Sequence, residues 1–243
     1  MGANERWADK SVESMYDKTL LALEIAAIKK RLRTGQFVVD AGCGEGEGTA
    51  QYADVAFVSA FDKSPERLDM ARERVGSDVC LFQHDVRERI PIGMAVDAVI
   101  SQRLLINLAS WAEQERALDN LTAILRPGGR LILSEGSQEG VTELNVWRAI
   151  YGLPPIPIPA HNVFLSDGDL LEYTDSHGFD LQAWDDFGAY YLLTRGVQPA
   201  LREDFHWDSP FNRASASPRI KELFVDTDRF SRIKVWVFER ERL

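Results

Sequence analysis

The segment from Val38 to Gly46 strongly restricts the folds that this chain can adopt. Two β-branched residues lead into Asp40, and glycines then stand at alternate positions, beginning with Gly42 and Gly44. Glycine accepts a positive φ and lets a ligand approach the backbone closely. A helix that starts after such a loop offers unpaired N–H groups. On the glycines alone, we expect a ligand-binding loop, and a tight strand-to-helix turn is the structural alternative.

Strand-like and helix-like segments alternate around this loop. The hydrophobic patterns predict strands over 37–39, 55–61, 79–82, 96–101 and 130–134, and helices over 21–32, from Ser64 onward and over 111–125. A proline-rich segment, 153–159, must be extended. Beyond it we expect a helix over 166–177, a strand over 179–184, a helix over 190–201 and a last strand over 232–238. Such alternation is typical of a parallel sheet covered by helices on both faces.

Acidic residues follow the first strands of this pattern. Asp62 ends the second strand, where a carboxylate suits a bidentate hydrogen bond to two ribose hydroxyls. The loop lacks the G-x-G-x-x-G spacing of dinucleotide sites. Asp40 would repel a pyrophosphate but attract an ammonium group. A ligand with a ribose and an amine therefore fits, and S-adenosylmethionine has both.

Five stretches, in order, resemble the successive motifs of class I methyltransferases that depend on S-adenosylmethionine. They are 40–46, 61–72, 83–85, 96–101 and 125–131. The resemblance implies an α/β, Rossmann-like sandwich with a seven-stranded sheet in the order 3-2-1-4-5-7-6, with strand 7 antiparallel. It also implies a single domain over 1–243. Its parts are a cofactor-binding core over 37–135, acceptor-site cap and lid elements over 140–231 around strand 6, and the terminal strand over 232–238.

The same resemblance assigns the cofactor contacts. The glycines would line the methionine and ribose, Asp40 would accept from the ammonium group, and Asp62 would bind the ribose. The adenine would meet Lys63, Asp85 and the N–H of Val86, and Ser101 would lie beside the methionine. The full set is Asp40, Gly42, Gly44, Gly46, Asp62, Lys63, Asp85, Val86 and Ser101. Asp40 as a loop brace, Asp85 as a helix N-cap and Ser101 as a plain strand end are the structural alternatives.

A second resemblance concerns the acceptor. Several stretches are similar to a bacterial subgroup that methylates sugars in cell-surface polysaccharides, namely 101–108, 153–157, 161–162, 190–195 and 208–212. A sugar hydroxyl must be aligned with the sulfonium and needs a base for its proton. Histidine suits that task at neutral pH. We expect His161 to be the base and His206 to be second in line, with a brace for the proline-rich segment as the alternative role of His161.

Six further residues are expected to contact the acceptor: Arg103, Asn107, Glu135, Trp147, Tyr190 and Tyr191. Arg103 could bind a sugar hydroxyl or clamp an acidic group bidentately, and its alternative is an ion pair with Glu135. The aromatic rings could stack on a sugar or belong to the core. The spacing of the carboxylates is not diagnostic of a metal site, so none is predicted.

Composition limits the remaining function classes. The formal net charge of −10 disfavours a broad nucleic-acid surface, and two cysteines exclude a disulfide framework or a cysteine zinc site. No apolar run approaches the roughly 20 residues that span a bilayer, so we expect a cytoplasmic protein without membrane insertion. We expect methyl transfer to a sugar or polysaccharide hydroxyl, which leaves S-adenosylhomocysteine as product. The alternatives are another small-molecule acceptor, such as a natural product or an acid, and a non-catalytic cofactor-binding protein. The oligomeric state is not predicted.

Overall fold

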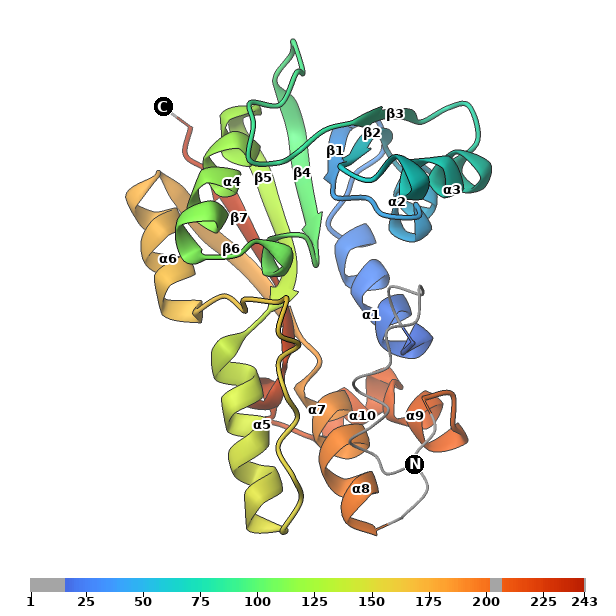
Figure 1. Ribbon diagram of the computed structural model, residues 1–243, viewed down its shortest axis with the longest axis vertical. Coiled ribbons are helices and arrows are strands. Elements are labelled where there is room, and N and C mark those ends of the chain that lie inside the picture. Colours follow the sequence, from blue (N-terminus) through green and yellow to red (C-terminus); the bar gives the residue numbers. More distant parts are fainter. Residues whose placement is uncertain (1–15, 202–206, 243) are drawn as a thin grey trace.

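The structure is a computed structural model that describes residues 16–201 and 207–242. Its centre is a seven-stranded sheet in the order β3-β2-β1-β4-β5-β7-β6, in which β7 runs antiparallel to both β5 and β6 (Figure 1). The strands are β1 (Phe37–Ala41), β2 (Phe57–Asp62), β3 (Cys80–Gln83), β4 (Val96–Gln102), β5 (Leu125–Gly136), β6 (Phe179–Asp186) and β7 (Ile233–Arg240). This order and the reversed β7 confirm the predicted fold.

Short and long helices connect the strands. The α-helices are α1 (Lys18–Lys29), α2 (Glu47–Tyr52), α3 (Pro65–Val75), α4 (Trp111–Ala123), α5 (Gln138–Ile150), α6 (Asp167–Ser176), α7 (Gly188–Tyr191), α8 (Gln198–Leu201), α9 (Pro210–Ser215) and α10 (Pro218–Leu223). The described residues also form two 3₁₀ turns, η2 (Leu105–Asn107) and η4 (Asp228–Phe230), and a π-helical stretch, η3 (Leu192–Val197). Because α7, η3 and α8 follow one another directly, they form the single helix expected near 190–201.

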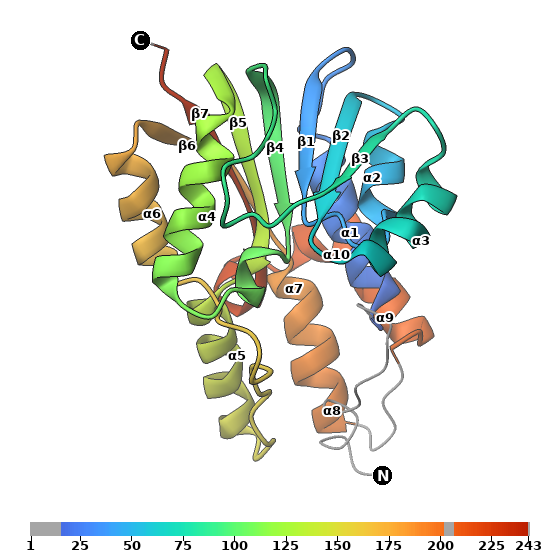
Figure 2. The ribbon, with the colours of Figure 1, turned by 45° about the horizontal axis from the view of Figure 1, so that its top comes forward.

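Successive residues of the strands face opposite sides of the sheet, and different helices cover those sides. Val38 packs in a cluster with side chains of α1 and α2, whereas Val39 packs in a second cluster with side chains of α4 and α6. Figure 2 shows these two groups of helices on either side of the strands. The sheet is therefore buried on both faces, as the hydrophobic runs of the parallel strands predict.

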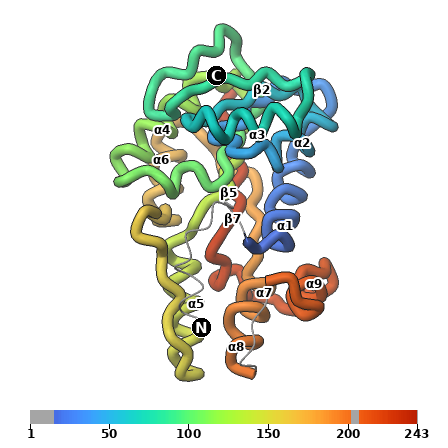
Figure 3. Tube along the Cα trace, turned by 45° about the vertical axis from the view of Figure 1, so that its right-hand side comes forward, coloured from blue at the N-terminus to red at the C-terminus, as the bar shows by residue number. Residues whose placement is uncertain are grey.

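Two helical arms extend past the carboxyl edge of the parallel strands. One is α5, and the other is the continuous helix from α7 to α8 (Figures 1 and 3). The proline-rich segment is extended, as expected, and returns beside α5. There, Asn145 donates its Nδ2–H to the Ile156 carbonyl at 3.0 Å and accepts the Ile156 N–H at 2.7 Å. Both arms belong to the part of the chain for which an acceptor-binding cap is predicted, and that role stays a prediction.

Three local features differ from the prediction. Helix α1 begins at Lys18 because the Asp17 side chain accepts the Leu20 N–H, and it ends earlier than 32. The strand expected over 130–134 begins earlier, at Leu125, because Pro127-Gly128-Gly129 lies within β5 as an irregularity between the pairs Val96↔Leu125 and Ala98↔Arg130. Helix α5 was not predicted.

Candidate active site

The glycine loop has the backbone that its sequence demands. Gly42, Gly44 and Gly46 adopt φ values of 68°, 55° and 77°, and each lies in the left-handed region. At Gly42 there is no room for a side chain either, because a Cβ would lie 2.7 Å from the Leu104 Cδ1 atom. Gly46 is the N-cap of α2. The loop therefore requires glycine for its conformation, and it leaves its backbone accessible beside the carboxyl ends of β1 and β4.

Asp62 is held at the end of β2 beside this loop. Its Oδ2 accepts the Gly44 N–H at 2.9 Å, and its Oδ1 accepts the Ser64 N–H at 2.9 Å. Each carboxylate oxygen keeps a lone pair for a further donor. The orientation thus suits the two ribose hydroxyls that the resemblance assigns to Asp62. Lys63, the next residue, is exposed, and its carbonyl accepts from the Gln83 side chain at 3.0 Å.

Asp40 is buried beneath the loop. Thr49 Oγ1 donates to Asp40 Oδ2 at 2.6 Å, so the predicted alternative of a loop brace describes one of its contacts. Burial, with a smaller contribution from the charge of Asp62, raises the pKa of Asp40 to about 7 against the lowering effect of the Thr49 bond. A ligand ammonium would favour the ionised form.

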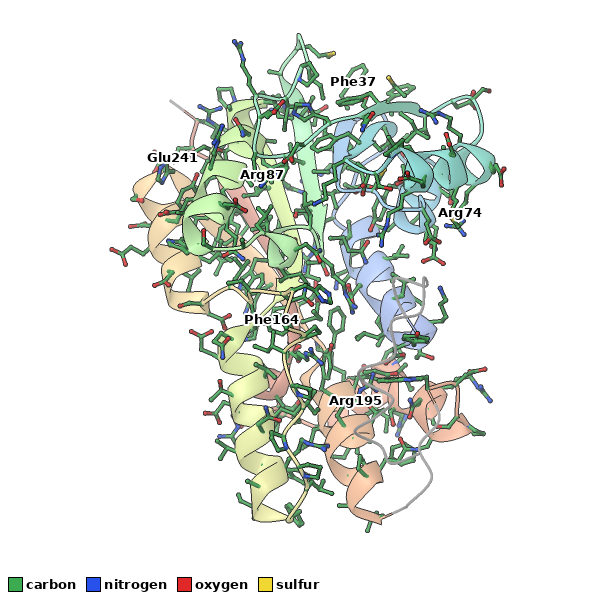
Figure 4. The ribbon with its side chains drawn as sticks, viewed as in Figure 1. Phe37, Arg74, Arg87, Phe164, Arg195 and Glu241 are labelled. Atoms are coloured by element: carbon green, nitrogen blue, oxygen red, sulfur yellow. The ribbon has the colours of Figure 1, made fainter. Side chains whose placement is uncertain are left out.

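Asp85 is engaged by an arginine of its own loop. Arg87 donates its backbone N–H and its Nε to Asp85 Oδ1, both at 3.0 Å, and its Nη2 to Oδ2 at 2.6 Å (Figure 4). The bonds from Arg87 lower the pKa of Asp85 to about 2. An adenine amino group would have to share this carboxylate with Arg87. The neighbouring Val86 is buried.

The side chain of Glu135, near the end of β5, is enclosed by the protein and is not open to an acceptor. Its side chain is fully buried and accepts the Ser101 hydroxyl at 2.7 Å, together with the N–H groups of Leu104 and Leu105 at 3.0 Å and of Ile106 at 3.3 Å. A carboxylate enclosed by four donors cannot reach an acceptor, so the predicted acceptor contact is corrected to a structural role. The Ser101 hydroxyl donates its proton to this carboxylate, and its predicted place beside the methionine stays a prediction. Together the two residues fix the turn that follows β4.

Arg103 begins that turn and pairs with a different acid from the one predicted. Its guanidinium donates Nε to Glu24 Oε2 at 3.1 Å and Nη2 to Glu24 Oε1, and Glu24 is completely buried. Arg103 also has a positive φ of 54°, which is uncommon outside glycine and marks a constrained position. With both carboxylate oxygens of Glu24 bound, Arg103 is not available for a bidentate clamp on an acceptor.

The segment that carries His161 docks onto the same turn. Asn162 donates its Nδ2–H to the Asn107 side chain at 3.1 Å and to the Ile106 carbonyl at 3.2 Å, and the Val163 N–H bonds the Ile106 carbonyl at 2.8 Å. His161 is exposed and is the residue before Asn162, which bonds η2. Asn107, the last residue of η2, is also exposed and is bonded by Asn162. His206 lies outside the described residues.

The aromatic residues predicted to stack on an acceptor are mostly enclosed. Tyr190 is buried, and its hydroxyl donates to both Asp17 oxygens, at 2.9 and 3.0 Å. Tyr191 is buried beside it, which favours the core alternative for both rings. Trp147 is only partly buried and stacks on Tyr151 with ring centroids 4.3 Å apart. Of the three aromatic residues, Trp147 is therefore the one whose ring is partly exposed and could still stack on an acceptor.

Charged residues that the sequence reasoning missed surround this region. Glu24 binds Arg103, Gln102 and Ser134, and Asp17 forms an ion pair with the buried Arg195. One signal could have found Glu24, because it is spaced four residues from Leu20 and four from Ile28 on the apolar face of α1. A charge on such a face must be paired.

Comparisons with known proteins agree with this geometry. Residues 38–129 match the family model described as a methyltransferase domain. An uncharacterised methyltransferase of Mycobacterium tuberculosis is 35% identical over 96 residues, which cover 39% of this chain and 37% of that protein. An O-methyltransferase of Penicillium expansum is 29% identical over 108 residues, which cover 42% of this chain and 38% of that protein. The chain thus spans less than two fifths of the length of these curated relatives.

The whole fold also has a solved counterpart. The magnesium protoporphyrin IX methyltransferase of Synechocystis PCC 6803, solved with bound S-adenosylhomocysteine, matches with a TM-score of 0.61 and 17% identity over 98% of this chain and 92% of that one. The fold is therefore the α/β, Rossmann-like sandwich of this neighbour, and residues 38–129 are similar to a methyltransferase domain. No described helix is long and apolar enough to cross a membrane. Within residues 16–201 and 207–242, no cluster of three metal-ligating side chains occurs.

Proposed function

We propose that this protein transfers the methyl group of S-adenosylmethionine to a hydroxyl of a small-molecule acceptor, with a sugar or polysaccharide as the leading candidate. One observation carries the proposal. Three glycines with positive φ place the loop after β1 against Asp62, whose carboxylate is already oriented by the Gly44 N–H. A loop of this shape, with acids that suit an ammonium and a ribose, fits the cofactor and not a dinucleotide pyrophosphate. S-adenosylhomocysteine would be the product.

Residues of the protein would position the acceptor and remove its hydroxyl proton. The cofactor supplies a methyl group activated by its sulfonium, so the protein has to position the acceptor and take up the hydroxyl proton. His161 is exposed, and the segment 159–164 that carries it is bonded to η2 beside the carboxyl end of β4. We assign it as the base that takes the hydroxyl proton, with Asn107 as a hydrogen-bonding partner of the acceptor. Residues 140–231 would form the acceptor-binding cap around β6.

The nature of the acceptor has two candidate answers. The sugar proposal is supported by the resemblance of the second half of the chain to polysaccharide-modifying enzymes. Another small molecule, such as a natural product or an acid, is supported by the relatives, since an O-methyltransferase and a porphyrin methyltransferase match this chain. A non-catalytic cofactor-binding protein would bind S-adenosylmethionine without turning over any acceptor, and the same assays would reveal it.

Calorimetry with S-adenosylhomocysteine tests the cofactor site. We expect Asp62→Ala to weaken binding by about 2 kcal/mol, because a charged acceptor is lost from two hydroxyls. The matched control is Asp69→Ala, since Asp69 is an exposed acid on the following helix whose partner is Arg72. Equal affinity of wild type and Asp62→Ala would refute the assignment of the loop.

Methyl transfer tests His161 once a panel of sugars and small hydroxyl compounds has yielded an acceptor. In single turnovers, His161→Ala should lower the rate by about 10²–10⁴-fold while the affinity for S-adenosylhomocysteine is unchanged. His177→Ala is the control, because His177 stacks on Tyr173 with centroids 4.0 Å apart and caps α6. A normal rate in His161→Ala would transfer the assignment to His206 or to water.

A further inference from the structure

Arg232 is a cation without a carboxylate partner among residues 16–201 and 207–242. Among the described residues, its guanidinium makes one hydrogen bond, from Nη2 to the Pro157 carbonyl at 3.3 Å, and it lies over the Phe164 ring at 5.1 Å. It forms no ion pair with any acid in the described part of the chain. The side chain is partly buried. An isolated, desolvated charge is costly, so its retention calls for a counter-ion.

Arg232 lies immediately before β7, beside the carboxyl end of β5, where we expect the acceptor to bind. Because β7 is antiparallel, its first residues lie at the carboxyl edge of β5, where Gly136 pairs with Ile233 and the Ser137 N–H bonds the Arg232 carbonyl at 2.9 Å. The two residues that contact the guanidinium, Pro157 and Phe164, flank His161 in sequence. Figure 4 shows Phe164 near the carboxyl end of β5, with Arg195 farther along toward α7.

Neighbouring charges add to the positive field here. Burial lowers the pKa of the Arg232 guanidinium to about 10, against the opposing effect of Tyr191, and the charges of Arg103 and Arg195 add smaller lowering contributions. Both neighbouring arginines have carboxylate partners, Glu24 and Asp17. Arg148, another buried arginine without an acid, instead donates to two carbonyls, those of Pro154 and Arg195. Arg232 therefore differs from Arg103, Arg148 and Arg195, whose guanidinium groups are bound by carboxylates or by two carbonyls.

We propose that the Arg232 guanidinium binds an oxyanion, a carboxylate or a phosphate, that the methyl acceptor carries. The inference rests on the proposed methyltransferase function and narrows its acceptor to an anionic compound, such as an acidic or phosphorylated sugar. A carboxylate or phosphate matches the planar fork of arginine and would neutralise the local positive charge. The Phe164 face beneath the guanidinium keeps that fork oriented. The acceptor hydroxyl would then lie on the same side of the sheet edge as His161.

Chemical modification of the wild-type chain tests the site without any substitution. Phenylglyoxal labelling followed by mass spectrometry would report the rates at Arg232 and at Arg229, in protein loaded with S-adenosylhomocysteine. Arg229 is the internal control, because it also lies over a phenylalanine, Phe230, at 5.0 Å but is exposed. We expect inorganic phosphate or acetate to slow labelling at Arg232 alone, compared with chloride at equal ionic strength. Equal protection of the two arginines, or none, would overturn the proposal.

Acceptor assays then distinguish the two oxyanions. Glucose, glucuronate and glucose 6-phosphate form a matched series for binding to the loaded protein, and for methyl transfer where it occurs. We expect one acidic member to bind better than glucose, and Arg232→Gln to remove that advantage, on the order of 10- to 100-fold. Arg232→Lys should retain part of it, and Arg229→Gln all of it. Preference for glucose over both acids would contradict the proposal.

The affinity for S-adenosylhomocysteine separates this proposal from the proposed function. If the wild type fails to bind it, the methyltransferase proposal fails, whatever happens at Arg232. If the wild type binds it but phosphate and acetate do not protect Arg232, only the anionic-acceptor proposal fails. If Arg232→Gln weakens cofactor binding as strongly as Asp62→Ala does, Arg232 serves the carboxylate of the cofactor, and the acceptor assignment is wrong.

Discussion

Asp40 is a residue at which cofactor binding and folding stability conflict. Its pKa rises from 3.8 to about 7 because burial disfavours the charge. The folded state therefore holds its proton more tightly than the unfolded state does, and stability declines as the pH rises from about 4 toward 7. An ammonium ligand needs the ionised form. The carboxylate thus lowers the stability of the free protein at neutral pH and strengthens its complex.

Cofactor binding should therefore depend on pH through Asp40. The affinity for S-adenosylhomocysteine should fall by about tenfold between pH 8 and pH 6, because binding then requires the loss of a proton from Asp40. Asp40→Asn should bind more weakly, show little of this dependence, and unfold at a higher temperature than the wild type at pH 8. Calorimetry and thermal unfolding at both pH values measure these effects. A variant with the same pH slope as the wild type would exclude Asp40 as its source.

Glu135 stabilises the turn after β4 by accepting three of its backbone N–H groups, so we expect its removal to destabilise the fold. Glu135→Ala would leave three backbone N–H groups, those of residues 104–106, without their acceptor. Each buried donor left unpaired costs about 1–3 kcal/mol, so we expect a loss of at least about 3 kcal/mol in the free energy of unfolding. Urea denaturation measures it. Glu143→Ala, at an exposed position of α5, should change stability by less than about 0.5 kcal/mol.

At the scale of elements, the cap depends on a close approach between α5 and the chain before β7. A Cβ at Gly140 would lie 1.9 Å from the Ser231 carbonyl oxygen, so only glycine fits there. This contact explains why α5 was missed. A glycine near the start of a segment looks like a turn signal, and nothing local shows that a distant backbone passes over it.

Two alanine substitutions near helix starts should have opposite effects. Gly140→Ala must push α5 away from Ser231, and we expect a loss of about 1–3 kcal/mol or more, as for overpacked cores. Gly168→Ala, in α6, meets nothing closer than 3.7 Å and should be neutral or stabilising by about 0.5–1 kcal/mol. Thermal unfolding of the two variants measures the difference. Equal midpoints would show that the backbone contact at Gly140 is not rigid.

On the scale of the whole molecule, one buried ion pair joins the first described helix to the cap. Asp17 caps α1 and accepts from both Tyr190 and Arg195, which belong to the helix that spans α7 to α8. Removal of one partner from such a pair costs about 3–5 kcal/mol. Asp17→Ala should therefore speed hydrogen exchange over residues 188–201. Lys18→Ala breaks only an exposed pair with Glu47 and should leave that exchange unchanged. Identical exchange in the two variants would contradict the coupling.

The core of the molecule was predictable because its signals are local. Strands β1 to β4 each end at one of the motif stretches, so the order of the sheet followed from the resemblance and the loop from its glycines. The charged network was not predictable, because pairing is a property of the fold. No spacing along the chain indicates that Arg103 pairs with Glu24 in place of Glu135, or that Arg232 comes to rest between Pro157 and Phe164.

The reversed direction of β7 has a practical consequence. Its first residue, Ile233, lies at the site edge beside Gly136, whereas Arg240 pairs with Phe179 at the opposite edge of the sheet. In Figure 1 this edge of the sheet lies away from the helical arms. A fluorophore, an affinity handle or a surface tether attached after this strand would lie at the edge of the sheet opposite the glycine loop and would leave the site exposed to solution. Immobilisation through a residue at the end of β7 would therefore suit biosensor measurements with small acceptors.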